Sequence, residues 1–80
     1  MDKRDQQGQI NMPKIIGENV RFYRLANDLT QERLAQLASI NVRHLQKIEA
    51  GEVNLTIITV HRLCVALGVQ PESLFKSKGD

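Results

Sequence analysis

The residues best suited to chemistry lie in a polar run at positions 42–47, VRHLQK. Gln46 and Lys47 follow Arg43 by three and four residues, so the three side chains share one face of a helix. The run contains no acid. On such a face arginine or lysine can donate to guanine O6 and N7, glutamine can pair with adenine, and Val42 can contact a thymine methyl. The run therefore indicates a surface that reads DNA bases, although its spacing would also fit a solvated polar helix face.

Apolar residues on either side of this run predict the two helices that present it. They recur at three- and four-residue steps, first at Leu34, Ala35 and Ala38 and then at Leu45 and Ile48. Residues 39–41, between the two sets, are too few for anything but a sharp corner. Thr30 and Asn41 each offer a side-chain oxygen to cap a helix start, and Gly51 can take the left-handed conformation that ends a helix. Residues 30–51 thus predict a helix-turn-helix.

Three further helices are predicted outside this unit. Pro13 suits the first turn of a helix that runs to about Asn27. A second helix runs from about Ile57 to Leu67, and Pro71 opens a short last helix. The predicted core residues of the first two are Ile16, Val20 and Tyr23, then Val60, Leu63, Cys64 and Leu67. The apolar residues of the last helix are Leu74 and Phe75.

The chain resembles a known family over residues 16–75. The matching features are Arg24, LTQERLAQLA at 29–38, IEAG at 48–51 and LCVALGVQPESLF at 63–75. They are similar to the Cro-type, or XRE-type, family of phage-repressor-like DNA-binding domains. The resemblance implies an all-α fold, a compact five-helix bundle with a helix-turn-helix, that binds operator DNA, usually as a homodimer. NLTIITV at 54–60 further resembles the controller proteins of restriction–modification systems.

The resemblance also implies roles for residues outside the base-reading face. Arg24 should form an ion pair with Glu49, the acid that ends the recognition helix, and so fix the angle of that helix. Gln31 resembles the family residue that binds a phosphate beside the groove. The loop after the recognition helix touches phosphates in the family, which makes Asn54 and Thr56 candidates, although either could instead cap the next helix.

Two apolar groups are candidates for contacts between subunits. In the family the C-terminal end of the fold commonly forms the dimer interface, and here it carries Leu74 and Phe75. Both side chains could instead be buried within the monomer. Ile15, Phe22 and Leu25 form a second apolar stripe on the first helix, which either packs under the last helix or faces a second subunit.

Ser39 departs from the family pattern. The family usually has glycine at this turn, where the backbone is left-handed. A residue with a Cβ in that conformation costs roughly 1–2 kcal/mol. We therefore expect a strained turn at Ser39.

Length and composition restrict the class of protein. Eighty residues make one domain, and the net charge of +2 permits nucleic-acid binding without arguing for it. We expect residues 1–12 to be a flexible arm, 13–76 the DNA-binding domain and 77–80 a frayed tail. A single cysteine and the lack of an apolar leader fit the cytoplasm. No apolar run approaches the roughly 18 residues of a membrane span.

No pattern points to catalysis or to a cofactor. The sequence has no glycine-rich phosphate loop, no cysteine cluster and no paired carboxylates in a plausible cleft. His61 lies three residues from Cys64, but two ligands make no zinc site, and Cys64 is predicted to be a small core residue. We therefore expect no enzymatic activity, no metal, no cofactor and no small-molecule ligand.

The predicted function is a sequence-specific, DNA-binding transcriptional regulator. It would bind a palindromic or pseudo-palindromic operator as a homodimer through the recognition helix at 42–50. An alternative is an antitoxin or adaptor module that acts through protein contacts, with the exposed apolar stripes as its surface. An RNA-binding module has less support, because it would normally need aromatic side chains that stack on unpaired bases.

Overall fold

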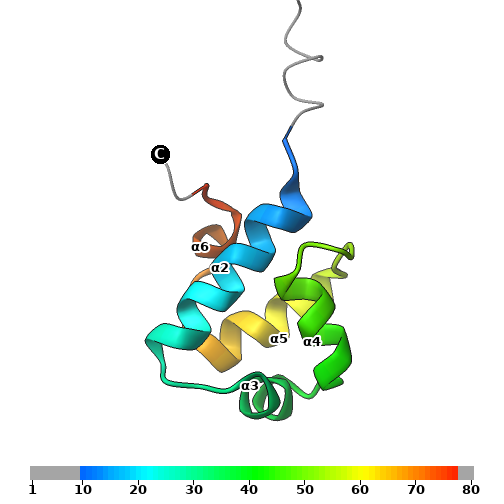
Figure 1. Cartoon of the computed structure of the whole chain (residues 1–80). Helices are drawn as coiled ribbons and strands as arrows, with labels where there is room; N and C mark the ends of the chain where they lie inside the picture. Colours follow the sequence, from blue (N-terminus) through cyan, green and yellow to red (C-terminus); the bar gives the residue numbers. More distant parts are fainter. Residues whose placement is uncertain (1–9, 78–80) are drawn as a thin grey trace, which may run out of the picture.

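The computed structural model describes residues 10–77, and all five expected helices are present in it (Figure 1). They are α2 (Met12–Ala26), α3 (Gln31–Ala38), α4 (Val42–Glu49), α5 (Ile57–Leu67) and α6 (Pro71–Phe75). No strand occurs among the described residues. The prediction of an all-α, five-helix fold is confirmed. Most of the expected arm at 1–12, and most of the expected tail at 77–80, lie outside the described residues.

Side-chain caps define where the helices start. Thr30 Oγ1 accepts a hydrogen bond of 3.0 Å from an amide in the first turn of α3, and Asn41 Oδ1 accepts one of 2.8 Å in α4. Thr56 Oγ1 does the same for α5 at 3.1 Å. α2 starts one residue before Pro13, because Asn11 caps it. Each cap satisfies an amide that has no partner within its helix.

Helices α2 to α5 all end in the same way. A residue one or two positions beyond the end of each helix takes a left-handed conformation. The backbone N–H of the residue that follows it donates to the carbonyl five positions back, at 2.9 to 3.1 Å. This arrangement satisfies carbonyls that the helix itself leaves unpaired. The left-handed turn predicted at Ser39 is confirmed, with φ of 57°. The residues in this conformation are Asp28, Ser39, Gly51 and Gly68.

The core forms where the inward faces of the helices meet. α2 packs against both α4 and α6, while α3 packs against α4 and α5 (Figure 1). Burial of apolar surface is the main stabilising contribution, and a chain of this length buries little of it. The fully buried side chains are Val20, Leu34, Leu45, Ile48, Leu63 and Leu74.

Gly17 allows α2 to lie directly against the end of α4. A Cβ at this position would collide with the carbonyl oxygen of Ile48 and would lie 3.0 Å from that of Glu49. Only a residue without a side chain fits at this contact. The close approach brings one flank of α2 alongside the recognition helix.

Asn19, on α2, forms hydrogen bonds with the end of α6. Its side chain is buried, and its Nδ2 donates to the carbonyl of Leu74 at 2.8 Å and to that of Lys76 at 2.7 Å. Both carbonyls lie at the C-terminal end of a five-residue helix, where no intrahelical donor is available. Asn19 therefore provides the donors that the end of this short helix lacks.

Candidate nucleic-acid interface

α4 separates apolar from polar residues onto opposite faces. Leu45 and Ile48 are fully buried against the core, while Arg43, Gln46 and Lys47 are exposed. No hydrogen bond or ion pair engages these three exposed side chains within the described residues. The sequence-predicted face is thus presented outward, with its donors available to a ligand.

Val42 and Glu52 affect the apolar contact and the charge that this face can offer to DNA. Val42 is half-buried and packs against the core, so only part of its side chain is available to a thymine methyl. Glu52, in the loop after α4, lines the same shallow depression as Arg43 and Lys47. An acid therefore borders the cationic surface. The helix itself ends at Glu49, one residue before the predicted limit, with Ala50 as its C-cap.

Arg24 and Glu49 form the ion pair that the resemblance implied. Arg24 Nε donates to Glu49 Oε2 at 2.7 Å, and its Nη2 donates to Oε1 at 3.1 Å. The two side chains are only 10% and 4% exposed. Arg24 Nη1 also donates to the carbonyl of Leu29 at 2.8 Å. A two-point pair of this kind fixes both distance and angle, so it holds α4 at a defined angle to α2.

Gln31 joins this pair. Its Nε2 donates to Glu49 Oε1 at 3.1 Å, and its side chain is half-buried at the first position of α3. One amide hydrogen is therefore engaged within the protein, whereas the amide group carries two. The contact of Gln31 with a phosphate stays a prediction.

The loop residues differ in how much of their polar surface is available. Asn54 is exposed, and no hydrogen bond to its side chain occurs within the described residues. Thr56 is exposed as well, but its hydroxyl caps α5 and also donates to Thr59 Oγ1 at 3.0 Å. The capping alternative is therefore realised for Thr56. Its hydroxyl could reach a phosphate only by exchanging the contact with Thr59.

The burial of Leu74 corrects one of the two candidates for a dimer interface. Leu74 is fully buried in the monomer and has no surface to offer a second subunit, because it fills the space between α6 and the core. Phe75 is 42% exposed and stays a candidate. In the second apolar stripe, Phe22 and Leu25 are 51% and 53% exposed, while Ile15 is half-buried.

Cys64 has the environment of a core residue, as predicted. It is buried, and this burial, followed by the charge of Glu72, raises the pKa of its thiol. The neutral thiol behaves as a small apolar group. Among the described residues, no cluster of three or more potential metal ligands occurs. No helix in the described part of the chain is long and apolar enough to cross a membrane.

Comparisons with known proteins agree with this geometry. A family model described as helix-turn-helix matches residues 20–74. Control protein C.SmaI of Serratia marcescens is 33% identical over 70 residues, which cover 88% of this chain and 83% of that protein. Control protein C.BamHI of Bacillus amyloliquefaciens is 32% identical over 65 residues, or 80% of each chain.

A solved structure shows the same arrangement of helices. The restriction–modification controller protein C.AhdI from Aeromonas hydrophila superposes with a TM-score of 0.76 at 30% sequence identity. The match covers 79% of this chain and 96% of that one. The resemblance to controller proteins predicted from residues 54–60 is thereby confirmed. The chain belongs to the helix-turn-helix family of DNA-binding transcriptional regulators.

Proposed function

We propose that this protein binds a palindromic or pseudo-palindromic operator as a homodimer, with α4 as the recognition helix of each subunit. Two such helices enter successive major grooves on one face of the duplex, about 34 Å apart. Arg43 and Lys47 read bases, supported by Gln46 and by the exposed part of Val42. Gln31, Asn54 and Thr56 contact phosphates beside the groove. The protein works in the cytoplasm and has no catalytic role.

The observation that carries this proposal is the outward face of α4. Arg43, Gln46 and Lys47 are exposed together, and their side chains lack protein partners within the described residues. Behind them, Leu45 and Ile48 are buried, so the helix cannot rotate about its axis without exposing its apolar side. A helix held in this way keeps the same donors pointing outward, which direct recognition of base edges requires.

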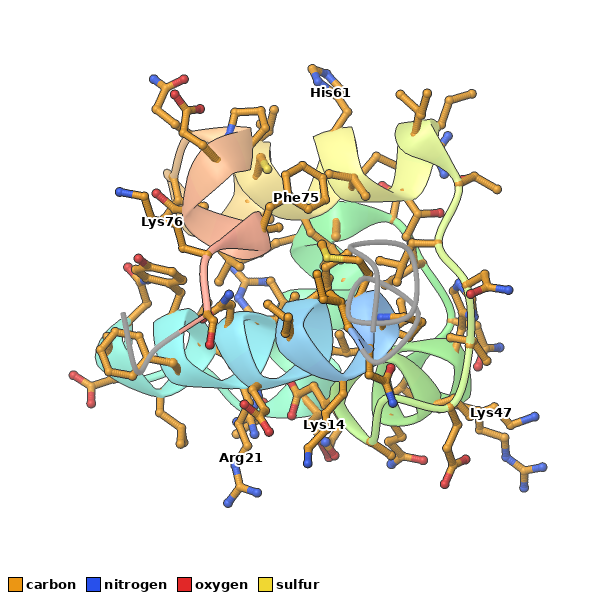
Figure 2. All side chains as sticks on the ribbon, turned by 90° about the horizontal axis from the view of Figure 1, so that it is seen from above. Lys14, Arg21, Lys47, His61, Phe75 and Lys76 are labelled. Carbon is orange, nitrogen blue, oxygen red and sulfur yellow. The ribbon has the colours of Figure 1, made fainter. Side chains whose placement is uncertain are left out.

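The proposal is tested by selecting binding sites from random duplex DNA and then measuring affinity for the selected site. Arg43→Ala should weaken that affinity by ~1–3 kcal/mol for each half-site and relax the preference at one base pair of each half-site. Lys76→Ala is the matched control, because Lys76 is an exposed cation on another side of the molecule (Figure 2). If no sequence is enriched, or if Arg43→Ala binds the selected site as the parent does, the proposal is wrong.

The relatives suggest what the operator controls. The similarity to C.SmaI, C.BamHI and C.AhdI supports a role as a control protein in a restriction–modification system. Such a role predicts binding upstream of genes for a restriction endonuclease and its methyltransferase near the gene for this protein. The measurement is footprinting over that upstream DNA, and a footprint only at unrelated promoters would argue against this role.

A further inference from the structure

We infer that α2 provides a second DNA contact, in which Lys14 and Arg21 bind backbone phosphates beside the groove entered by α4. This inference rests on the proposed function, because it concerns the same bound duplex. It adds a helix outside the helix-turn-helix to the DNA-binding surface. Lys14 and Arg21, which lie before the helix-turn-helix in the sequence, would then contact phosphates in addition to Gln31, Asn54 and Thr56.

The packing of α2 on α4 brings these two residues to the edge of the recognition helix. Gly17, which meets the carbonyl of Ile48, lies between them in sequence. Lys14 and Arg21 are three and four residues from Gly17, so all three positions lie on one side of α2. Lys14 also adjoins the loop after α4, since a Cβ on Gly51 would lie 3.0 Å from its Cα. The flank of α2 that touches α4 therefore carries both cations.

The cations of this flank lie on the same half of the molecule as Lys47 of the recognition helix. Figure 2 shows Lys14 and Arg21 projecting from the lower edge of the molecule, while Lys47 extends from its lower right corner. His61, on α5, projects from the opposite side. A duplex placed across this corner could contact Lys47 and the two α2 cations together.

The side chain of Arg21 makes no ion pair within the described residues, although the exposed acid Glu18 lies three residues before it on α2. Arg21 lines a shallow cleft that also includes Thr30 and Gln46, from the start of α3 and the outer face of α4. Arg24 and Glu49 line the cleft too, but they neutralise each other as an ion pair. Within the described residues, the side chains of Lys14 and Arg21 have no hydrogen bond or ion pair. Of the charged residues that line this cleft, Arg21 is the one outside the Arg24–Glu49 ion pair, and the cleft opens beside the base-reading face.

The spacing of the two cations suits separate phosphates. Seven residues of an α-helix span about 10.5 Å. Along one DNA strand there is a phosphate for about every 3.4 Å of helix axis. Side chains that leave α2 in parallel from Lys14 and Arg21 would therefore reach different phosphates, and each should contribute one contact in each subunit.

The test compares Lys14→Gln, Arg21→Gln and the double variant with the parent on the selected site and on a mismatched site. In a homodimer each substitution removes one phosphate contact from each subunit, so each single variant should make the slope of log K against log salt concentration shallower by about 1.8, and the double variant by about 3.6. The ratio of affinities for the two sites should stay the same, because phosphate contacts carry no base information. Both residues are exposed, so thermal melting should confirm that the variants fold.

Lys76→Gln is the control for a loss of charge as such. It removes the same charge from a side chain that Figure 2 shows projecting elsewhere, and it should leave the slope unchanged. If the double variant keeps the parent slope, or changes it no more than Lys76→Gln does, the α2 contact is wrong. The proposed function survives that result as long as Arg43→Ala still weakens binding. If Arg43→Ala also binds as the parent does, the function itself fails.

Discussion

At the scale of single residues, Arg24 controls the position of the recognition surface without facing it. Its guanidinium makes two hydrogen bonds to Glu49 and one to the carbonyl of Leu29. Glu49 also accepts from Gln31. The carboxylate of Glu49, on α4, therefore accepts hydrogen bonds from side chains on both α2 and α3. Three helices are held together at one buried charge.

Arg24→Ala should destabilise the protein by ~3–5 kcal/mol, because the buried carboxylate of Glu49 would lose its charged partner. The measurement is the free energy of unfolding from urea titration. The control is the double variant Arg24→Met with Glu49→Met, which removes both charges and should recover most of the loss. A single variant as stable as the parent would mean that the pair is solvated in solution.

Ser39→Gly should stabilise the protein by ~1 kcal/mol, because glycine takes the left-handed conformation at Ser39 without the cost of a Cβ. Thermal melting measures the effect, and affinity for DNA should not change. The hydrogen bond of 3.5 Å from Arg62 is to the backbone carbonyl of Ser39 and survives the substitution. Ser73→Gly, within α6, is the control and should lower the melting temperature. A lower melting temperature for Ser39→Gly contradicts the prediction.

At the scale of elements, the contact between α2 and α4 sets the shape of the proposed DNA-binding face. α2 reaches the end of α4 only because Gly17 has no side chain there. This contact places the α2 flank beside the recognition helix, while the Arg24–Glu49 pair fixes the angle between the two helices. The proposed DNA-binding face thus belongs to two packed helices and not to the helix-turn-helix alone.

Gly17→Ala should destabilise the protein, although alanine in a helix is normally more favourable than glycine by up to ~1 kcal/mol. The new methyl would meet the carbonyl of Ile48, so α2 would have to move away from α4. Overpacking of this kind typically costs ~1–3 kcal/mol.

Urea unfolding of Gly17→Ala would be compared with Glu18→Ala, a neighbouring change at an exposed position of the same helix. The exposed change should have little effect. An increase in stability for Gly17→Ala would show that the two helices are less closely packed in solution.

At the scale of the whole molecule, a second subunit would supplement a small core. A chain of this length buries only ~60% of its unfolded surface, so association can add a large share of the stability. Phe75 leaves an aromatic ring 42% exposed beside a buried Leu74. It is the residue at this end of the fold that remains available to a partner copy.

The melting temperature should therefore rise with protein concentration if the protein is a homodimer. Phe75→Asp should abolish that dependence, because it places a charge in the proposed interface. Leu37→Asp is the control, since Leu37 is 45% exposed on α3. Differential scanning calorimetry over a hundredfold range of concentration gives the answer. Melting that is independent of concentration in the parent would exclude a dimer of this kind.

The sequence by itself determined the helices and their order, because the signals for them are local. Periodic apolar residues, the caps at Thr30 and Asn41, and the glycine at position 51 all act within one or two helical turns. The outward face of α4 followed from the same periodicity. Arg24 and Glu49, 25 residues apart, could be paired in advance only through resemblance to a family.

Only the tertiary structure decided which residues meet across the fold. Asn19 donates to carbonyls 55 and 57 residues away, and no local pattern marks it for that role. Gly17 is essential only because the end of α4 lies against it. Leu74 and Phe75 are neighbours of similar hydrophobicity, yet one is buried and the other is partly exposed. Such outcomes depend on how helices pack, since the same side chain has a different role when a different element lies opposite it.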